Sequence, residues 1–480
     1  MNETSEVVIV GGGLAGLVSA VRLAQAGVDC LVLERSTEDA YLCNSRMTSG
    51  AMHCCSLSLD GDPQTLRAAL DDRTNGEADP ALADAVIADG PRVVRFLREH
   101  GVAITTGEDY PAFAYTLQPP TLVPEGYAWR DKGGDRMMRR LEARLRELGG
   151  RLLRGRSVTR LIVEEGRIAG CVGDTADGVH FEVRAKTVVL AAGGFEANLD
   201  LLRGTVSPKP ERLFQRNSGA ADGSALSMAL NVGAACTSLG GFYGHVLSRD
   251  AFGNDRLWPF PYLDPILQAG IVVGPDGRRF ADEGLGGTYM ANAIARLADP
   301  ASAVVIVDER IWAERGSQNP PPPYAPNPRL PDCGGTMFTA SSVTGLADLA
   351  GLPATALTAE VSRYNDAVRA GTTAELSPQR TARKFEPWEI TNGPFHAFPA
   401  CAGITYTMDG IAIDDDSRVL DERRRPIANL YAAGCSTGGL EGGTRAGYVN
   451  GMLKSSVTAL RAAEHLLGLP HGEPGRSRSS

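Results

Sequence analysis

A strand, tight turn and helix near the start of the sequence constrain the fold more than any other feature. The apolar, β-branched run at residues 7–10 is followed at once by Gly11-Gly12-Gly13-Leu14-Ala15-Gly16 and then by a helical pattern. Gly11 permits the turn, Gly13 lets the backbone approach a pyrophosphate at the helix N-terminus, and Gly16 lets the helix pack on the strand. The motif predicts a dinucleotide-binding site, because strand, glycines and helix stand in the required order.

Three distant segments together predict one FAD-binding fold. The strand after the first helix, residues 30–33, ends in Glu34, whose carboxylate suits a pair of ribose hydroxyls. Residues 188–194 again carry a buried strand to a glycine pair, and residues 429–451 repeat the pattern near the end of the chain. The predicted fold class is α/β, with a Rossmann-like FAD-binding domain and an inserted α+β substrate cap domain.

Composition indicates a large globular enzyme. The 480 residues are 43% hydrophobic and 22% charged, which is ordinary for such a protein and unlike a disordered chain. Lys plus Arg number 48 against 57 Asp plus Glu, and the net charge of -9 disfavours nucleic acid as a partner.

The nine cysteines lack the spacing of a metal site. No CxxC or zinc-like pattern occurs, so we expect reduced thiols and no metal. The first strand begins within a few residues of Met1, and no apolar run is long enough to cross a bilayer. We therefore expect a cytoplasmic protein without a membrane span.

Changes in local composition and in the length of the expected elements predict the domains of the chain. Helices are expected at residues 79–100, with a division at Gly90-Pro91, at 135–148, at 357–369 and after 451. Short glycine-rich and aromatic segments from about residue 221, with the proline run 320–324, indicate an inserted domain. The expected layout is an FAD-binding domain (1–220), a cap (221–346), the rest of the FAD-binding domain (347–467) and a flexible tail (468–480).

Several further motifs carry a family resemblance. They are Asn44-Ser45-Arg46, Leu190-Ala191-Ala192-Gly193-Gly194-Phe195, Arg279-Phe280-Ala281-Asp282-Glu283-Gly284, Gly403-Ile404-Thr405-Tyr406 and Asn429-Leu430-Tyr431-Ala432-Ala433-Gly434. With the first glycine motif, they make the chain resemble the fumarate reductase and succinate dehydrogenase flavoprotein family over nearly its whole length. Within that family it looks closest to tricarballylate dehydrogenase-like members and more distantly similar to 3-ketosteroid Δ1-dehydrogenases.

The resemblance implies how FAD is held. Members with covalently attached flavin have a histidine where this chain has Asn44, so the resemblance implies noncovalent FAD. The implied cofactor-binding residues are Gly11, Gly13, Leu14, Ala15, Gly16, Glu34, Arg35, Asn44, Ser45, Arg46, Thr48, Ser49, Gly50, Val158, Ala191, Ala192, Gly193, Asp222, Gly434, Cys435, Asn450 and Gly451.

The family chemistry exchanges a hydride between flavin N5 and a carbon β to a carbonyl or carboxylate, with a proton added or removed at the α carbon. This needs a group that polarises the substrate oxygen, an acid or base near the α carbon and a dry pocket over the flavin. The implied partners are a small-molecule ketone or carboxylate and a separate electron acceptor or donor, since the sequence has no recognisable haem or iron-sulfur motif.

Five residues are candidates for catalysis. His245 aligns with a substrate-site histidine and Arg445 with a carboxylate-binding arginine. His396 stands where ketosteroid dehydrogenases have a carbonyl-polarising tyrosine, Tyr406 where fumarate reductases have a histidine, and Tyr289 near a catalytic tyrosine. The alternatives are hydrogen-bonded core histidines, an arginine that braces the glycine-rich loop, and packing aromatics.

Two departures narrow the chemistry. The proton-donating arginine of fumarate reductases is replaced at residues 286–288 by Gly, Gly and Thr, and residues 400–402 lack an arginine of tricarballylate-type members. These losses favour the dehydrogenase direction and, as substrate, a monocarboxylate or a ketone, cyclic ketones included. An amine or amino-acid oxidase and a non-catalytic flavin-binding subunit remain as alternatives.

Overall fold

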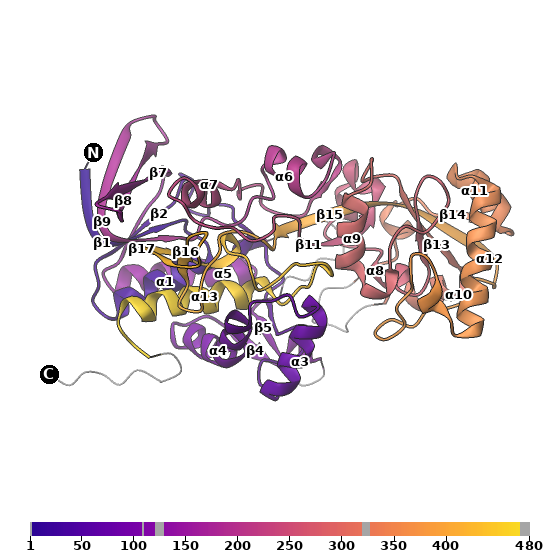
Figure 1. The fold of residues 1–480 in the computed structure, drawn as a ribbon, viewed down its shortest axis with the longest axis horizontal. Helices are drawn as coiled ribbons and strands as arrows, with labels where there is room; N and C mark the ends of the chain where they lie inside the picture. Colours follow the sequence, from indigo (N-terminus) through magenta and orange to yellow (C-terminus); the bar gives the residue numbers. More distant parts are fainter. Residues whose placement is uncertain (1, 108–109, 121–128, 319–326, 471–480) are drawn as a thin grey trace.

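The computed structural model describes residues 2–107, 110–120, 129–318 and 327–470. Two β-sheets organise these residues, and Figure 1 shows them side by side along the longest axis of the molecule. The proline run expected to be a connector, residues 320–324, and most of the expected tail lie outside the described residues.

The first sheet is the Rossmann-like one. Its order is β16-β17-β9-β1-β2-β6, and β8 also pairs with β9. β1, β2, β6, β9 and β17 run parallel, with Val8 opposite Leu31 on one side and Val188 on the other. The strands are β1 (Asn2–Val10), β2 (Cys30–Leu33), β6 (Arg151–Leu153), β7 (Arg156–Glu164), β8 (Arg167–Thr175), β9 (His180–Leu190), β16 (Arg418–Leu420) and β17 (Pro426–Ala432). The predicted α/β class is confirmed.

Helices from both chain ends cover this sheet. α1 (Leu14–Gln25) contacts α5 (Gly133–Glu147) and α13 (Gly451–Leu466), which brings the two ends of the sequence together. A smaller layer contains α2 (Asn44–Met47), α3 (Pro63–Thr74), α4 (Pro80–Glu99) and the strands β3 (Ala51–Met52), β4 (Ile104–Thr106) and β5 (Tyr115–Leu117). Among the described helices, none has both the length and the apolar character that crossing a bilayer requires.

The helix expected to divide at Gly90-Pro91 is continuous. α4 passes through Pro91 without interruption, and Asp79 caps its N-terminus by accepting hydrogen bonds from the backbone N–H groups of Ala81 and Leu82. Packing of α4 against α13 offsets the hydrogen bond that proline removes, so tertiary contact overrides the local signal.

The second sheet belongs to the cap. Its order is β10-β15-β13-β12, with β11 and β14 also paired to β15. The strands are β10 (Phe214–Gln215), β11 (Phe242–Ser248), β12 (Ile271–Val273), β13 (Ala303–Asp308), β14 (Phe338–Ala340) and β15 (Phe395–Thr407). The helices in and beside the cap are α6 (Leu199–Thr205), α8 (Asp264–Leu267), α9 (Gly287–Ala295), α10 (Glu309–Arg315), α11 (Val343–Ala350) and α12 (Ala354–Ala370), whereas α7 (Ser224–Leu230) contacts β7 of the first sheet.

The cap sheet includes strands from outside the predicted cap range, residues 221–346. β10 precedes the first expected boundary, whereas β15 follows the second, and both pair within the cap sheet. α11 contacts β14, β15 and α12, so these helices also lie with the cap. Strand pairing joins segments far apart in sequence, which a change of local texture does not reveal.

Candidate functional site

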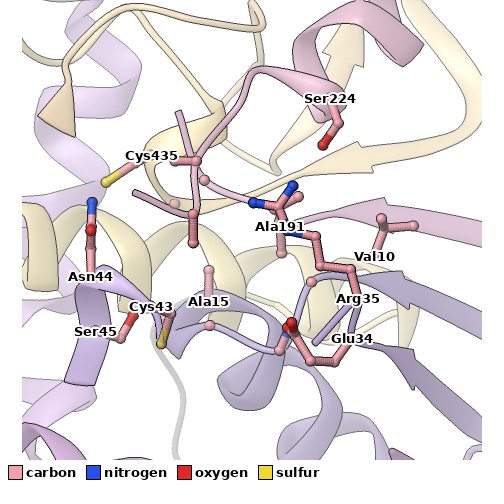
Figure 2. A pocket seen from close by; sticks show the side chains of 18 of the residues that line it. Val10, Ala15, Glu34, Arg35, Cys43, Asn44, Ser45, Ala191, Ser224 and Cys435 are labelled. Atoms are coloured by element: carbon pink, nitrogen blue, oxygen red, sulfur yellow. The ribbon is translucent and has the colours of Figure 1, made fainter. Parts of the chain in front are cut away.

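A crevice of about 930 Å³ lies where β1, β2, β9 and β17 reach their carboxyl ends. Ligands of open α/β sheets bind at this edge. In Figure 2, Glu34 and Arg35 lie toward one end of the crevice, and Asn44, Ser45 and Cys435 toward the other. Fifteen of the predicted cofactor residues line it: Gly11, Gly13, Leu14, Ala15, Glu34, Arg35, Asn44, Ser45, Val158, Ala191, Ala192, Gly193, Asp222, Gly434 and Cys435.

The glycines of the first turn shape the wall of the crevice. Gly11 has φ +105°, and a Cβ there would lie 2.6 Å from the Ala191 carbonyl oxygen, so two glycine-rich segments approach closely. A Cβ on Gly16 would lie 2.0 Å from the Gly11 oxygen, which fits helix-strand packing. The nearest atom to a Cβ on Gly13 is 3.6 Å away, so this glycine leaves the crevice open at the start of α1.

Polar groups suited to a nucleotide stand at the β2 end. The Glu34 carboxylate accepts hydrogen bonds from the backbone N–H groups of Gly12 (2.9 Å) and Ser36 (3.0 Å), which hold it at the end of β2. Arg35 forms an ion pair with Asp222 across the crevice wall. Carboxylate, open glycines and the helix N-terminus are the donor and acceptor set that an FAD ribose and pyrophosphate require.

Asn44 connects the other end of the crevice to the cap strand β15. Its Nδ2 donates to Glu196 Oε1 (2.6 Å) and to the Thr405 carbonyl oxygen (3.3 Å), while its Oδ1 accepts from Ser218 N–H (2.9 Å). Glu196 is buried, and burial raises its pKa to about 7, although hydrogen bonds from Thr407 and Asn44 act to lower it. An asparagine amide is no nucleophile, so the geometry here suits noncovalent FAD.

Seven predicted cofactor residues do not line the crevice: Gly16, Arg46, Thr48, Ser49, Gly50, Asn450 and Gly451. Arg46 is fully buried, pairs with Asp135 and lies over the Tyr41 ring. Asn450 caps α13 by accepting from Leu453 N–H (2.9 Å) and donates to the Ala51 carbonyl oxygen (3.1 Å). These contacts hold the surrounding loops in place.

Beyond the Asn44 end, aromatic side chains gather around β11 and β15. Tyr243 and Tyr406 are opposite each other in the strand register, with ring centroids 5.5 Å apart. Tyr448 stacks on Tyr243 at 3.9 Å, and Tyr262 stacks on His245 at 4.6 Å. We call these five residues the aromatic cluster; Tyr243, His245, Tyr262 and Tyr448 are half-buried. The structure thus joins two predicted catalytic residues, His245 and Tyr406, and adds three tyrosines.

Tyr406 is placed by a buried carboxylate. Its hydroxyl lies 3.1 Å from both oxygens of Glu441, and Glu441 also accepts from the backbone N–H groups of Val449 and Asn450. Burial and the Glu441 charge raise the pKa of Tyr406 well above its ordinary value. A Cβ on Gly451 would lie 3.0 Å from the Tyr406 ring, so a predicted cofactor position and a predicted catalytic residue are in contact.

Arg216 is a site residue that the sequence reasoning missed. Its side chain passes over Gly403, where a Cβ would lie 2.5 Å from Arg216 Cδ. Nη1 donates to Thr405 Oγ1 (2.8 Å) and Nη2 to the Pro259 carbonyl oxygen (3.4 Å). Burial raises the pKa of Tyr243 and of Tyr262, and the Arg216 charge opposes this; burial lowers the pKa of His245, and the Arg216 charge lowers it further. The glycine of the Gly403-Ile404-Thr405-Tyr406 motif was the available signal, because a glycine within a strand marks a close approach.

Asp264 lies against Gly287, one of the three residues that the resemblance places where fumarate reductases have an arginine. A Cβ on Gly287 would lie 1.9 Å from the Asp264 carboxylate, so residue 287 has no room for a side chain. Asp264 is nearly buried and pairs with His245. The loss of the arginine is therefore accompanied by a carboxylate-histidine pair at the same place.

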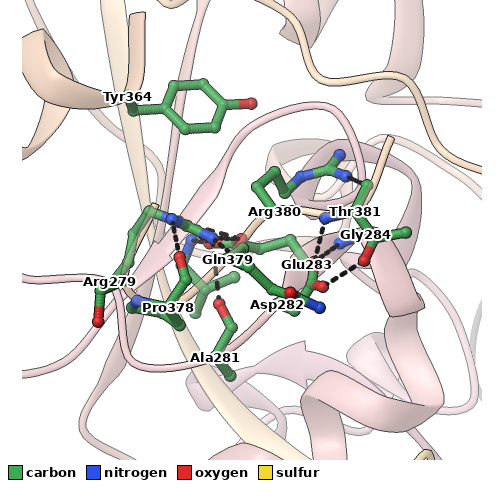
Figure 3. A network of polar contacts seen from close by, with 12 residues as sticks. Arg279, Ala281, Asp282, Glu283, Gly284, Tyr364, Pro378, Gln379, Arg380 and Thr381 are labelled. Atoms are coloured by element: carbon green, nitrogen blue, oxygen red, sulfur yellow. Dashed lines mark hydrogen bonds and ion pairs between the residues drawn. The ribbon is translucent and has the colours of Figure 1, made fainter. Parts of the chain in front are cut away.

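The segment before α9 is held by the network in Figure 3. Arg279 and Glu283 form a fully buried ion pair, and Arg279 also donates to the carbonyl oxygens of Pro378 and Gln379. Asp282 accepts hydrogen bonds from the N–H and hydroxyl of Thr381. The Arg279–Gly284 motif thus fixes the loop after α12 against the start of α9 and has a structural role.

Three predicted catalytic residues lie outside the aromatic cluster. His396 lies ten residues before Tyr406 on β15, which corresponds to about 33 Å at about 3.3 Å per residue of strand. Its two ring nitrogens form hydrogen bonds with Thr339 and Glu309. Tyr289 is on α9, where burial and the nearby Asp282 charge raise its pKa. Arg445 is half-exposed and donates to the Asp72 carbonyl oxygen (3.0 Å). His396 and Tyr406 are too far apart to act on one substrate atom, because β15 is extended between them.

A parallel α/β sheet closed from both chain ends, with a nucleotide crevice at its carboxyl edge, defines a dinucleotide-binding flavoprotein. The model of the family described as FAD binding domain matches residues 6–450. The chain therefore belongs to this family, and FAD is its cofactor.

Known relatives agree with this assignment. NADH:fumarate oxidoreductase from Klebsiella pneumoniae (strain 342) is 24% identical over 93% of this chain, which spans 46% of that protein's length. The 4-oxocyclohex-2-ene-1-carboxylate 5-dehydrogenase of Sinomonas cyclohexanicum is 28% identical over 64% of this chain and 55% of its own. The structure of 3-ketosteroid-Δ4-(5α)-dehydrogenase from Rhodococcus jostii RHA1 shares the fold, with a TM-score of 0.70, 22% identity and 96% of each chain covered. The predicted resemblance to fumarate reductases and ketosteroid dehydrogenases is confirmed, whereas the closer likeness to tricarballylate dehydrogenases stays a prediction.

Proposed function

We propose that the protein interconverts a saturated and an α,β-unsaturated ketone or monocarboxylate, using noncovalently bound FAD and a separate electron carrier. The observation that carries this proposal is the aromatic cluster with Arg216. It adjoins the end of the crevice at Asn44, because Asn44 and Arg216 both donate hydrogen bonds to Thr405. FAD supplies hydride transfer when bound, and the surrounding residues bind the substrate, exclude water and move the proton.

Arg216 supplies the charge that such a substrate needs. A guanidinium donates paired hydrogen bonds to a carbonyl or carboxylate and stabilises the negative charge that develops on that oxygen. Hydrogen bonds to Thr405 and to the Pro259 carbonyl oxygen hold Arg216 in place. Its charge acts to lower the pKa of both Tyr243 and His245. Arg445, predicted to bind a carboxylate, is a second candidate anchor that would have to leave Asp72.

The cluster favours a ring-shaped substrate of low charge. Four tyrosine rings present apolar faces that would pack on a cyclic substrate, and their hydroxyls supply polar contacts. The Sinomonas relative is named for a 4-oxocyclohexene carboxylate, a cyclic ketone with one carboxylate. The Asp264 carboxylate beside Gly287 leaves no room for the reductase arginine, which supports the dehydrogenase direction.

An anaerobic absorbance titration tests this proposal. Cyclohexanone, 4-oxocyclohexane-1-carboxylate, succinate, tricarballylate and aspartate are added separately to the yellow protein, and products are identified by mass spectrometry. We expect the two cyclic ketones to bleach the oxidised flavin band and yield unsaturated products. Bleaching by aspartate with release of ammonia would instead establish an amino-acid oxidase.

A variant pair tests the role of Arg216. Hydrogen bonds to charged groups contribute about 1.5–3 kcal/mol, so Arg216→Met should lower the rate of bleaching about 10- to 100-fold with FAD retained. Arg203→Met removes an exposed arginine paired with Glu211 and should leave the rate unchanged. Equal rates in the wild type and Arg216→Met would contradict the assignment.

A further inference from the structure

Three side chains beside Arg216 form a continuous hydrogen-bonded chain. Tyr243 and His245 are two residues apart on β11, and the Tyr243 hydroxyl lies 3.0 Å from His245 Nε2. His245 Nδ1 lies 2.7 Å from Asp264 Oδ2, and Asp264 Oδ1 accepts from Val246 N–H at 3.0 Å. Tyrosine, histidine and aspartate thus stand in the order of a nucleophile, base and orienting carboxylate in other enzymes.

The surroundings of His245 fix its protonation. Burial lowers the pKa of His245. The Asp264 charge raises this pKa and the Arg216 charge lowers it, and because the net shift is downward the imidazole is neutral at neutral pH. A neutral ring has one donor and one acceptor nitrogen. With Nδ1–H donating to the Asp264 carboxylate, Nε2 is left to accept the Tyr243 hydroxyl proton.

Tyr243 is the member of this chain placed to meet a substrate. Its ring is half-buried between Tyr448 and the opposite Tyr406, which contacts the predicted cofactor position Gly451. Burial and the Asp264 charge raise the pKa of Tyr243, although Arg216 opposes them, so its hydroxyl stays protonated at neutral pH. A phenol in this state abstracts a proton only if its own proton can leave, and His245 Nε2 is its outlet.

We infer that Tyr243 exchanges the proton with the α carbon of the substrate and that His245 and Asp264 relay it, a role that rests on the proposed function. In dehydrogenation, the Tyr243 oxygen takes the α proton while its own proton passes to His245 Nε2, and Asp264 stabilises the imidazolium. The electron pair of the α C–H bond forms the C=C bond as hydride leaves the β carbon for the flavin. Reduction reverses each step, with Tyr243 as the acid.

The relay replaces Tyr289, the tyrosine expected from the resemblance. Tyr289 lies on α9, and the neighbouring charge that raises its pKa most is Asp282, which forms part of the Arg279–Thr381 network. The described structure gives it no histidine that could take its proton. The two tyrosines are therefore a matched pair for an experiment.

Tyr243→Phe and Tyr289→Phe are compared with wild-type holoenzyme, using cyclohexanone and 4-oxocyclohexane-1-carboxylate as probes. Two rates are measured: anaerobic flavin bleaching, and exchange of the α protons of each probe into deuterated water by NMR. General acid-base catalysis contributes about 10²- to 10⁴-fold, so Tyr243→Phe should lower both rates by that factor with FAD retained. Tyr289→Phe should stay within about threefold of the wild type. A wild-type rate in Tyr243→Phe, or the larger loss in Tyr289→Phe, would overturn the relay.

The pH profile separates a relay from a merely structural contact. Dehydrogenation needs neutral His245, so the wild-type rate should fall only as pH drops through the pKa of His245, which burial lowers from its ordinary value. His245→Gln should be slow and should lose this acid limb, and an unchanged limb would contradict the role of His245.

A measurement without substrate distinguishes failure of the relay from failure of the proposed function. The Nδ1 proton hydrogen-bonded to Asp264 should give a low-field NMR resonance in wild type and in Tyr243→Phe, but not in His245→Gln or Asp264→Asn. If no probe reacts while this resonance is present, the proposed function fails and the hydrogen-bonded chain stands. If probes react but the resonance is absent in wild type, the relay fails alone.

Discussion

At the residue scale, glycine positions with no room for a side chain are as informative as the side chains of the site. Gly287 and Gly403 each allow one charged neighbour, Asp264 and Arg216, to lie against the backbone. Both neighbours then reach His245, directly or through their charge. The identity of these glycines therefore controls the electrostatics of the site.

Gly287→Ala tests this control. Its Cβ would collide with the Asp264 carboxylate, so we expect a loss of about 1–3 kcal/mol in unfolding free energy, as for other overpacked sites, and at least tenfold slower turnover. Gly204→Ala in α6 meets no atom within 4 Å and should stabilise the protein by about 0.5–1 kcal/mol. Chemical denaturation with bound FAD measures both changes; a neutral Gly287→Ala would show that Asp264 can move.

Glu196 gives the stability a pH dependence. Its folded pKa of about 7 exceeds the ordinary 4.5, so the native state holds its proton more tightly than the unfolded chain. Stability from this group is therefore present at low pH and lost as pH rises from about 4.5 to 7. The loss is at most about 3.5 kcal/mol, since one pKa unit corresponds to about 1.4 kcal/mol.

Glu196→Gln should remove this dependence. Wild type should lose stability relative to the variant between pH 5 and pH 8, as measured by denaturation at a series of pH values. Asp409, whose pKa burial raises to about 6, affects both proteins equally and cancels in the difference. Glu314→Gln, an exposed carboxylate paired with Arg310, is the control and should parallel the wild type.

At the element scale, the Arg279–Gly284 motif joins two segments that are distant in sequence. The buried Arg279–Glu283 pair and the Asp282–Thr381 bonds hold the loop after α12 on the start of α9 (Figure 3). α9 in turn carries Gly287 against Asp264 and contacts β11 and β15. The motif thus acts on the site through the position of a helix.

Removal of one charge from this pair should be severe. Arg279→Met leaves the Glu283 carboxylate buried without its partner, which typically costs about 3–5 kcal/mol. Arg310→Met breaks an exposed pair of the same i,i+4 spacing and a cation–π contact with Trp388, and it should change stability by at most about 1.5 kcal/mol. Thermal unfolding of the two holoenzymes provides the comparison, and similar midpoints would refute this role.

At the scale of the whole molecule, sequence patterns predicted the FAD-binding half better than the cap. The turn at Gly11 and the acidic end of β2 at Glu34 are local signals, and local geometry creates the crevice there. The aromatic cluster depends on the register of β11 with β15, which pairs Tyr243 with Tyr406 across more than 160 residues of sequence. Arg216 and Asp264 follow no motif, and His396 could be placed far from Tyr406 only once β15 was known to be one extended strand.

The length of β15 also limits how this enzyme could be re-engineered. The strand starts beside α11 at the outer end of the cap (Figure 1) and ends at Thr407, and its Thr405 carbonyl oxygen accepts a hydrogen bond from Asn44 of the crevice. A chimaera that exchanged residues 221–346 alone would cut the cap sheet between strands and leave β10 and β15 in the host. A chimaera with a new substrate specificity therefore requires junctions outside β10 and β15. The inserted segment then carries its own cap sheet, including the strand that holds the residue at the position of Tyr406.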